Sequence, residues 1–502
     1  MLAWTIYLSF AGALAQALLP KGRNELARWL ALATATAGLA LAVAGFAAGA
    51  AHHYALTTVV DVPWVPSMGI HYTLAADGIS LVLVLLTGLA AVAGVLFSWN
   101  IEHRTNEFFA FYLALIGGVY GVFLSFDLFL LFVFYEIAIV PKYFLIAIWG
   151  STRREYGAMK LALYSFVGSA MVLIGLLAAY AESGSHSTGL VALAGAGLPV
   201  SFQMWCFPLV FVGFAILAGM WPFHTWAPTG HVAAPTAASM LLAGVVMKLG
   251  AYGCLRVAMT VFPHGMDPWG FTFLGLGSWR EVFALLAVIG IVYGALVALV
   301  QSDFKFVIGY SSVSHMGFVL LGLMTLKQIG MTGAVLQMFS HGILAGLLFA
   351  IVGRIVYERT HTRQLADLEG MHLSKRLPFA AWAFVIAGMA AMGLPGFSGF
   401  IAEFQVLTGA WQAEPWWTLA AGVGIVVGVA YTWRALQKAF FSDHTPAPHV
   451  HDHEHDLAAV TWPEKTGVCL LIGASLWVGL YPRILLEAIE PAVKALLAGG
   501  LR

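Results

Sequence analysis

The sequence predicts an all-α integral membrane protein with about 14 transmembrane helices, and three observations support this. First, 61% of the 502 residues are apolar. Second, only 10% are Asp, Glu, Lys or Arg, whereas a soluble domain has roughly a quarter. Third, the apolar residues form runs of about 20, the length that crosses a bilayer core of roughly 30 Å. Nucleic-acid binding is excluded, because 24 basic residues balance 24 acidic ones.

Fourteen apolar runs follow one another along the chain, and two of them must be broken. The seventh run ends at Trp221-Pro222, with Ala227-Pro228 shortly after it, and the twelfth run contains Leu394-Pro395-Gly396. Proline removes a backbone donor and clashes with the preceding turn, so both helices are interrupted there. The predicted spans are residues 3–19, 27–49, 78–98, 108–124, 127–149, 160–181, 203–221, 236–258, 282–300, 306–325, 330–353, 378–412, 416–437 and 466–482.

The two breaks fall in corresponding places of two five-helix blocks, roughly residues 108–258 and 282–437, whose direct sequence similarity is weak. Broken helices in corresponding places of two five-helix blocks are typical of inverted repeats. We therefore expect helices 1–3 in residues 1–105, a first repeat of helices 4–8 in 106–260, a second repeat of helices 9–13 in 280–440, and a His-rich loop with the last helix in 441–502.

Basic residues predict the orientation of the chain in the membrane. Sixteen of the 24 Lys and Arg residues are assigned to loops after odd-numbered spans, and six, including Arg256, to loops after even-numbered spans and the C-terminal tail. Lys142 and Lys248 lie within helices. By the positive-inside rule, the first set is cytoplasmic and both termini face the outside.

Five ionisable residues stand alone in apolar surroundings, at mid-helix or beside a break, on five different helices. A charge at the bilayer centre costs at least about 2.5 kcal/mol, so such residues indicate function by default. Their side chains hold or pass protons, which predicts a proton path across the plane of the membrane. These residues are Glu136, Lys248, His315, His341 and Glu403.

Each of these residues also has a structural interpretation. A lone histidine in an apolar helix is commonly a hydrogen-bonded core residue, and the glutamate and lysine fit a static interhelical ion pair.

Asp127 and Asp303 lie near helix ends, where caps are expected. His224 and His231 flank the prolines of the seventh span and either gate protons or satisfy freed carbonyl groups. The tract 449–456, HVHDHEHD, fits a solvated loop or a metal site.

The three cysteines do not indicate a cofactor. Cys206, Cys254 and Cys469 lie in apolar runs without metal-ligand spacing. No disulfide framework, iron–sulfur cluster or zinc site is indicated. We expect no metal and no redox centre in this chain.

Four segments carry a resemblance to a known family. The sequence resembles the antiporter-like membrane subunits of proton-pumping NADH-quinone oxidoreductase (complex I), most closely chain M, and is related to subunits of multi-subunit cation/proton antiporters. The resemblance covers roughly residues 65–435. It rests on FDLFLLFVFYEIAIVPKYFLIAIWG, WPFHTWAPTGHVAAPTAASMLLAGVVMKLGAYG, SDFKFVIGYSSVSHMGFVL and LPGFSGFIAEF.

The resemblance implies a role for each matched residue. Glu136 matches the fifth-helix carboxylate whose charge drives a neighbouring lysine, and Lys248 matches the eighth-helix lysine that links two half-channels. The two histidines, His315 and His341, continue the line, and Glu403 matches the residue that opens to the far side. Lys305, in SDFK, matches the cytoplasmic start of a helix and is a candidate gate.

The resemblance also implies partners and a location. The expected partners are other antiporter-like membrane-arm subunits, the lipid bilayer and a peripheral redox arm. That arm would hold the quinone, FMN, NADH and iron–sulfur clusters. The expected location is a prokaryotic inner (plasma) membrane. Three alternatives remain open from the sequence: a subunit of a multi-subunit cation/proton antiporter or of an inorganic-carbon uptake system, a non-pumping spacer, and sodium in place of the proton.

One departure from the family concerns its central lysine. The family places a lysine in the broken seventh helix, and alignment through PFHTWAPTGH puts Leu217 there. Lys142 is an added lysine on the helix of Glu136. Six residues correspond to about 600° of rotation and 9 Å of rise, so Lys142 lies about 120° from the Glu136 face. We hypothesise that Lys142 replaces the missing lysine; the competing interpretation is an impaired or divergent copy.

Overall fold

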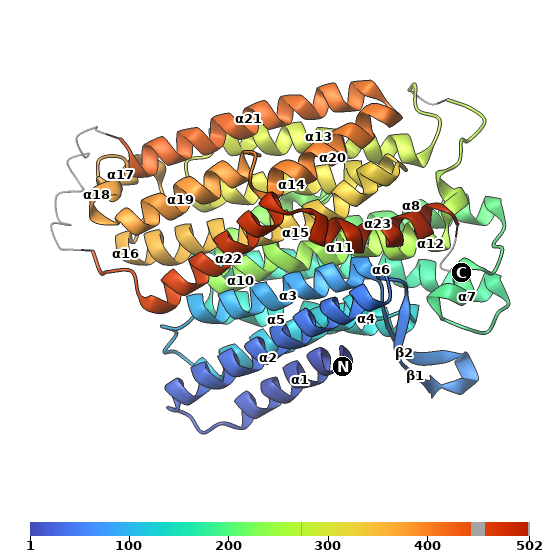
Figure 1. Ribbon diagram of the computed structural model, residues 1–502, viewed down its shortest axis with the longest axis horizontal. Coiled ribbons are helices and arrows are strands. Elements are labelled where there is room, and N and C mark those ends of the chain that lie inside the picture. The colour runs from blue at the N-terminus through green and yellow to red at the C-terminus, as the bar shows by residue number, and fades with distance from the viewer. Residues whose placement is uncertain (273, 443–456, 500–502) are drawn as a thin grey trace.

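The computed structural model describes residues 1–272, 274–442 and 457–499, and most of them lie in long, roughly parallel helices (Figure 1). The bundle is built around α3, α10, α11 and α15, whose residues are almost completely buried. The first four long helices are α1 (Ala3–Leu18), α2 (Asn24–Ala51), α3 (Gly78–Phe97) and α4 (Thr105–Leu124). They are followed by α5 (Leu128–Trp149), α6 (Arg154–Ser183), α8 (Val200–Ala218) and α9 (Trp226–Ala233).

The span after α9 is a composite helix. It contains α10 (Thr236–Leu241), the π-helix η3 (Leu242–Val246), α11 (Met247–Gly253), the π-helix η4 (Cys254–Ala258) and α12 (Met259–Val261). The second part of the bundle contains α13 (Trp279–Val300), α14 (Phe304–Met324), α15 (Gln328–Ala350), the π-helix η6 (Ile351–Tyr357), α16 (Glu358–Thr360), α19 (Pro378–Ala391), α20 (Ser398–Ala413), α21 (Pro415–Phe440), α22 (Trp462–Leu480) and α23 (Arg483–Leu497).

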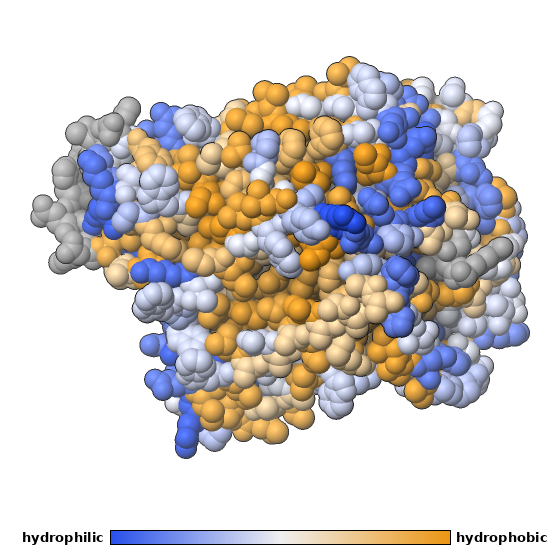
Figure 2. Space-filling model, viewed as in Figure 1, coloured by the Kyte–Doolittle hydropathy of each residue, from blue (hydrophilic) through white to orange (hydrophobic). Residues whose placement is uncertain are grey.

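Eleven helices among the described residues are long and apolar enough to cross a membrane, or up to twelve if α22 and α23, bent by 71°, form one span. The molecule is therefore a multi-pass membrane protein. Of the fourteen predicted spans, the first is a helix of 16 residues and the twelfth is divided into helices of 14 and 16 residues, so the count of fourteen stays a prediction. Figure 2 shows hydrophobic residues over the middle of the face in view and hydrophilic residues at both ends and over α23.

Both breaks lie where the prolines predict them. α8 ends at Ala218 and α9 begins at Trp226, with a short 3-10 turn, η2 (Phe223–Thr225), between them. α19 ends at Ala391 and α20 begins at Ser398. Gly393 and Gly396 have φ values of 74° and 101° in the second break, a region that glycine occupies without steric strain. This turn lets the chain re-enter the bundle at a new angle.

Aspartates fix the starts of three core helices. Asp77, Asp127 and Asp303 accept hydrogen bonds from backbone N–H groups at the starts of α3, α5 and α14, respectively. The capping roles predicted for Asp127 and Asp303 are confirmed. Such caps satisfy donors that the membrane interior cannot hydrate.

The structure departs from the sequence prediction in two further ways. Strands β1 (Thr57–Val65) and β2 (Ile70–Ala76) form an antiparallel hairpin beside the bundle, near α4 and α7 (Leu190–Ala194) (Figure 1). The prediction that Arg256 is a loop residue is wrong. Arg256 lies in η4, is 0% exposed, and pairs with Asp77 at 2.6 Å. Because Arg256 is buried and paired with Asp77, it cannot be counted among the loop charges that predict the orientation of the chain.

Candidate functional site

Lys248 is held in the centre of the bundle by the irregular helix that carries it. It lies on α11 between the two π-helices η3 and η4 and is 0% exposed. Its Nζ atom donates a hydrogen bond to the carbonyl oxygen of Ala243 in η3. A π-turn widens the helix, which allows a backbone carbonyl to accept from a side chain, and such turns are frequent at functional sites. The irregular backbone thus supplies the partner that a buried lysine needs.

Lys248 also contacts the first of two histidines. Its Nζ lies 2.7 Å from Nδ1 of His341 on α15. A lysine ammonium donates to a neutral imidazole nitrogen, and a neutral amine accepts from an imidazole N–H. The contact therefore permits a proton to pass in either direction between the two groups.

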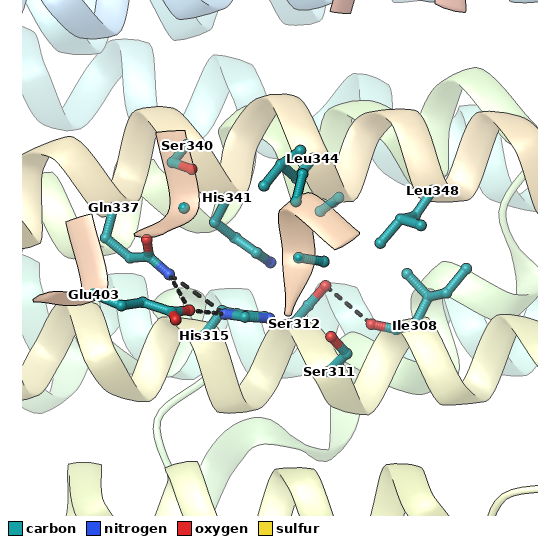
Figure 3. Close-up of a pocket in the computed structure, with 14 residues that line it drawn as sticks. Ile308, Ser311, Ser312, His315, Gln337, Ser340, His341, Leu344, Leu348 and Glu403 are labelled. Atoms are coloured by element: carbon teal, nitrogen blue, oxygen red, sulfur yellow. Dashed lines mark hydrogen bonds and ion pairs between the residues drawn. The ribbon is translucent and has the colours of Figure 1, made fainter. Parts of the chain in front are cut away.

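The second histidine joins the first to a carboxylate. The rings of His341 and His315 stack with centroids 5.4 Å apart. His315 Nδ1 lies 3.0 Å from Oε1 of Glu403, in the first half of α20 after the second break. Lys248, His341, His315 and Glu403, which we call the relay, thus lie in a row across four helices, and within this described part of the chain the two histidines are joined by a ring stack and not by a hydrogen bond. Figure 3 shows the second half of this path.

Gln337 is a member of this cluster that the sequence analysis missed. Its Nε2 atom lies 3.4 Å from both His315 Nδ1 and Glu403 Oε1 (Figure 3). Gln337 precedes His341 by four residues on α15, and residues with this spacing share a helix face. That spacing was the signal that could have identified Gln337.

A narrow cavity of about 10 Å³ lies beside the relay. This is close to the space that one water molecule needs. Nε2 of His341 and Oε1 of Gln337 are buried without a protein partner, so a water there would satisfy groups that are costly to leave unbonded. The lining contains Ser311, Ser312, Ser340, His315, His341, Gln337 and Glu403 together with aliphatic residues.

The first part of the bundle holds buried polar groups without such contacts. Lys142 is 0% exposed on α5, and its Nζ makes no hydrogen bond within the described residues. Oε1 of Glu136, on the same helix, is likewise without a partner there. The two side chains are close enough to interact electrostatically. In the described part of the chain, no hydrogen bond joins Lys142 to the relay.

His224 and His231 lie near the first break, and both are buried. The ring of His231 makes no hydrogen bond to a described residue, whereas His224 interacts with the backbone of Pro222. His231 therefore satisfies no freed carbonyl group among the described residues, and the alternative stays open for His224. The ring of His231 packs against that of Phe349 at a tilt of 33°, with centroids 4.9 Å apart, and His231 interacts electrostatically with both Lys248 and Lys305.

Lys305 lines a larger polar cavity of about 180 Å³ at one end of the bundle. Its Nζ donates to the carbonyl oxygen of Ala234 at 3.1 Å, just after α9. Asp303 caps the helix of Lys305 and also pairs with Arg363 at 3.3 Å. Lys305 therefore lies between this cavity and the unpaired ring of His231.

Metal ligands do not gather in the part of the chain that the structure describes. There, no group of three or more His, Cys, Asp or Glu side chains is placed to hold a metal ion. The His-rich tract 449–456 lies outside the described residues.

Comparison with known proteins assigns the chain to a family. Residues 125–428 match the model described as NADH:quinone oxidoreductase/Mrp antiporter, TM. The chain belongs to this family. The matched region contains the relay, both breaks, Glu136 and Lys142.

Relatives within the NADH:quinone oxidoreductase/Mrp antiporter family resemble the chain along nearly its whole length. NADH-quinone oxidoreductase subunit M of Rhodobacter capsulatus is 34% identical over 98% of this chain and 95% of its own. An NAD(P)H-quinone oxidoreductase chain 4 of Synechococcus sp. (strain JA-3-3Ab) is 36% identical over 96% of this chain and 90% of its own.

Solved structures show the same fold. A chain of respiratory complex I from Thermus thermophilus with bound NADH is 27% identical, with a TM-score of 0.88 over 99% of both chains. A chain of the Mrp complex from Dietzia sp. DQ12-45-1b is 21% identical, with a TM-score of 0.83 over 99% of this chain and 97% of that one. The second likeness concerns the fold alone.

Proposed function

We propose that this chain is a proton-translocating membrane-arm subunit, similar to chain M, of a complex I-type NADH-quinone oxidoreductase. The observation that carries the proposal is the row of relay residues from Lys248 to Glu403, in which a small cavity lies beside the stacked histidines. Isolated charges are expensive in a membrane, whereas a chain of exchangeable groups is what proton passage requires. The full-length relatives named for NADH-quinone and NAD(P)H-quinone oxidoreductases support the same function.

Electrostatic coupling would drive the relay. An opposite charge within about 4–6 Å shifts a buried group's pKa by one to three units, at about 1.4 kcal/mol per unit. A charge change at Glu136 would thus load or unload Lys142, and the altered field would act on Lys248. The proton would then move through the two histidines to Glu403 and leave beside the second break.

Protons would enter through the polar cavity at Lys305. The cavity lies at the end of the bundle, and His231 lies in the electrostatic field of both Lys305 and Lys248. A ring without a hydrogen-bond partner is free to change its protonated nitrogen. Lys305 and His231 would therefore gate uptake, with His224 farther from the path.

Lys142 would replace the lysine that the family has at the position of Leu217. Leu217 is buried in α8 and cannot carry charge. Lys142 is the nearby buried cation whose field reaches Glu136. Because Lys142 lacks a hydrogen bond, little local structure opposes the movement of its side chain.

The complete architecture would contain fourteen membrane-crossing helices. α1 would count as one span, and α19 with α20 as a single broken span. Residues 106–260 and 280–440 would form two inverted repeats, between the N-terminal helices of 1–105 and the last helix in 441–502. Both termini would lie on the outer (periplasmic) side of a prokaryotic inner membrane.

Other subunits would supply the redox chemistry. Quinone, FMN, NADH and iron–sulfur clusters would belong to a peripheral arm and its neighbours, with further antiporter-like subunits beside this one. This chain would bind no cofactor, because its three cysteines lack the spacing of cluster or zinc ligands.

Replacement of Glu403 in the intact complex, reconstituted in vesicles, tests the function. We expect Glu403→Gln to lower proton uptake at least about tenfold, because the last proton acceptor is lost. Glu490→Gln, which removes an exposed carboxylate on α23, is the control and should leave uptake unchanged. Normal uptake by Glu403→Gln would contradict the relay mechanism.

The identity of co-purifying chains separates the main alternative. The Mrp complex shares the fold, and a cation/proton antiporter subunit would use the same charged residues. Recovery with quinone-reducing and iron–sulfur subunits would support the proposal. Recovery with antiporter subunits alone would favour the alternative.

A further inference from the structure

Three buried serines connect α22 to the relay. Oγ of Ser475 on α22 lies 3.1 Å from Oγ of Ser398, which in turn lies 2.8 Å from Oγ of Ser340 on α15. All three side chains are at most 1% exposed. α22 follows the region that the family model covers, which ends at residue 428. The last long helix is thus bonded to the site from outside the matched region.

The middle serine joins two helices. Ser398 is the first residue of α20, and the residue at the capping position before it, Phe397, makes no side-chain cap. The Ser398 hydroxyl contacts a serine on each of the two neighbouring helices, α15 and α22. Ser340 directly precedes His341 and lines the relay cavity (Figure 3). The start of α20 is therefore fixed by α22 on one side and by the relay helix on the other.

The backbone of the second break is also pressed against α22. A Cβ atom added at Gly479 would lie 2.3 Å from the carbonyl oxygen of Gly396 and 2.4 Å from Phe397. A Cβ added at Gly393, earlier in the break, would lie 3.0 Å from Oε2 of Glu403. The break is thus packed between α22 and the last carboxylate of the relay.

The other end of α22 is anchored to the continuation of α15. Glu464 is 1% exposed, forms an ion pair with Arg354 Nε at 2.7 Å and accepts a hydrogen bond from Arg359 Nη2 at 2.8 Å. Glu464 and Ser475 are eleven residues apart, about 16 Å along a helix. α22 is therefore tied to the α15–η6–α16 helix at two levels and can hold α20 at a fixed position.

We propose that α22 acts as a splint for the second break, and that Ser475 and Gly479 are positioning residues for the Glu403–His315 pair. Neither residue exchanges a proton with the relay. They fix the start of α20, five residues before Glu403, so that the carboxylate stays within hydrogen-bond reach of His315. This inference rests on the proposed function, since it concerns how the relay releases its proton.

Two glycines of α22 provide a matched test in the reconstituted complex. Gly479→Ala must push the break away, whereas a Cβ at Gly473 meets nothing within 4 Å. We expect Gly479→Ala to lower proton uptake about tenfold, because small misplacements of reacting groups are costly, and to move its pH profile. Gly473→Ala should match the wild type in rate and profile. Identical behaviour of the two variants would overturn the splint.

Ser475→Ala is the milder variant. It tests the role of α22 if the Gly479→Ala chain does not assemble into the complex. Loss of one buried hydrogen bond predicts a decrease of roughly two- to fivefold in uptake, again with a moved pH profile. Ser9→Ala removes a buried helical hydroxyl in α1 that bonds only to a backbone carbonyl, and should leave the profile in place. A Ser475→Ala profile that coincides with the wild type would overturn the proposal.

Glu403→Gln separates a failure of the proposal for α22 from a failure of the relay itself. If Glu403→Gln loses uptake while Ser475→Ala and Gly479→Ala behave as wild type, the splint is wrong and the relay stands. If Glu403→Gln pumps normally, the relay itself is wrong.

Discussion

Two groups of buried ionisable side chains in this molecule differ in how they are bonded. In the relay, Lys248, His341, His315 and Glu403 contact one another within hydrogen-bond or stacking distance. A second group, which we call the unpaired group, consists of Glu136, Lys142, His224 and His231, and none of its members bonds to another ionisable side chain among the described residues.

The contrast indicates different tasks. A row of groups in contact can pass a proton once the space between the two histidine rings is bridged, whereas a buried group without a partner carries a large desolvation cost. Such a cost favours movement, hydration or a change of charge, all of which suit a switch. The relay would therefore conduct, and Glu136 with Lys142 would control when it does so.

Replacement of the central lysine, Lys248, should lower proton uptake more than the other variants below, because it interrupts the relay. In Lys248→Met, we expect proton uptake by vesicles containing the complex to decrease to less than about a tenth, because a group that exchanges protons is lost and His341 Nδ1 loses its partner. Lys494→Met, at an exposed position on α23, is the control. Retention of more than half of the uptake would show that the proton bypasses α11.

Removal of charge from the unpaired group tests the switch. We expect Glu136→Gln and Lys142→Met each to lower uptake about tenfold, because each removes one partner of an electrostatic step of one to three pKa units. If the two residues act together, the double variant should be no worse than either single one. Lys375→Met, at an exposed position of the short helix α18 (Leu373–Arg376), is the control. Normal uptake by Lys142→Met alone would reject the relocated lysine.

The identities of the buried charged residues could be predicted from the sequence because charge inside an apolar run is conspicuous. Glu136, Lys248 and Glu403 needed only that signal. The breaks were also predictable, since proline acts through local geometry. In the same way, Asp127 and Asp303 could be identified as caps from their places before apolar runs.

The contacts between these residues could not be predicted in the same way. Lys248 meets His341 across 93 residues of sequence, and such contacts depend on how helices pack. The π-helices that flank Lys248 have no local sequence signal that we recognise. Arg256 was misplaced because its partner, Asp77, lies 179 residues away. A charge near the end of an apolar run looks the same whether it is solvated or buried against a distant carboxylate.

The bridging amide should give a smaller effect within the relay. Gln337→Leu keeps the volume of the side chain and removes both 3.4 Å contacts. We expect uptake to decrease about threefold, since long hydrogen bonds contribute at the low end of the usual range. Gln328→Leu, at the exposed start of the same helix, should change nothing. A loss as large as that of Lys248→Met would make Gln337 a member of the conducting chain.

Replacement of His224 should have the smallest effect on proton uptake. Such a result would show that His224 takes no part in the switch. Its ring packs near Tyr293 and Tyr310, with centroids 5.2 Å and 6.2 Å away. A phenyl ring preserves such aromatic contacts, so His224→Phe should change uptake by less than about twofold. His231→Phe is the matched comparison, and it should lose more, because His231 interacts with both Lys248 and Lys305. Equal losses in both variants would place His224 on the path of proton uptake and extend the switch region to α13.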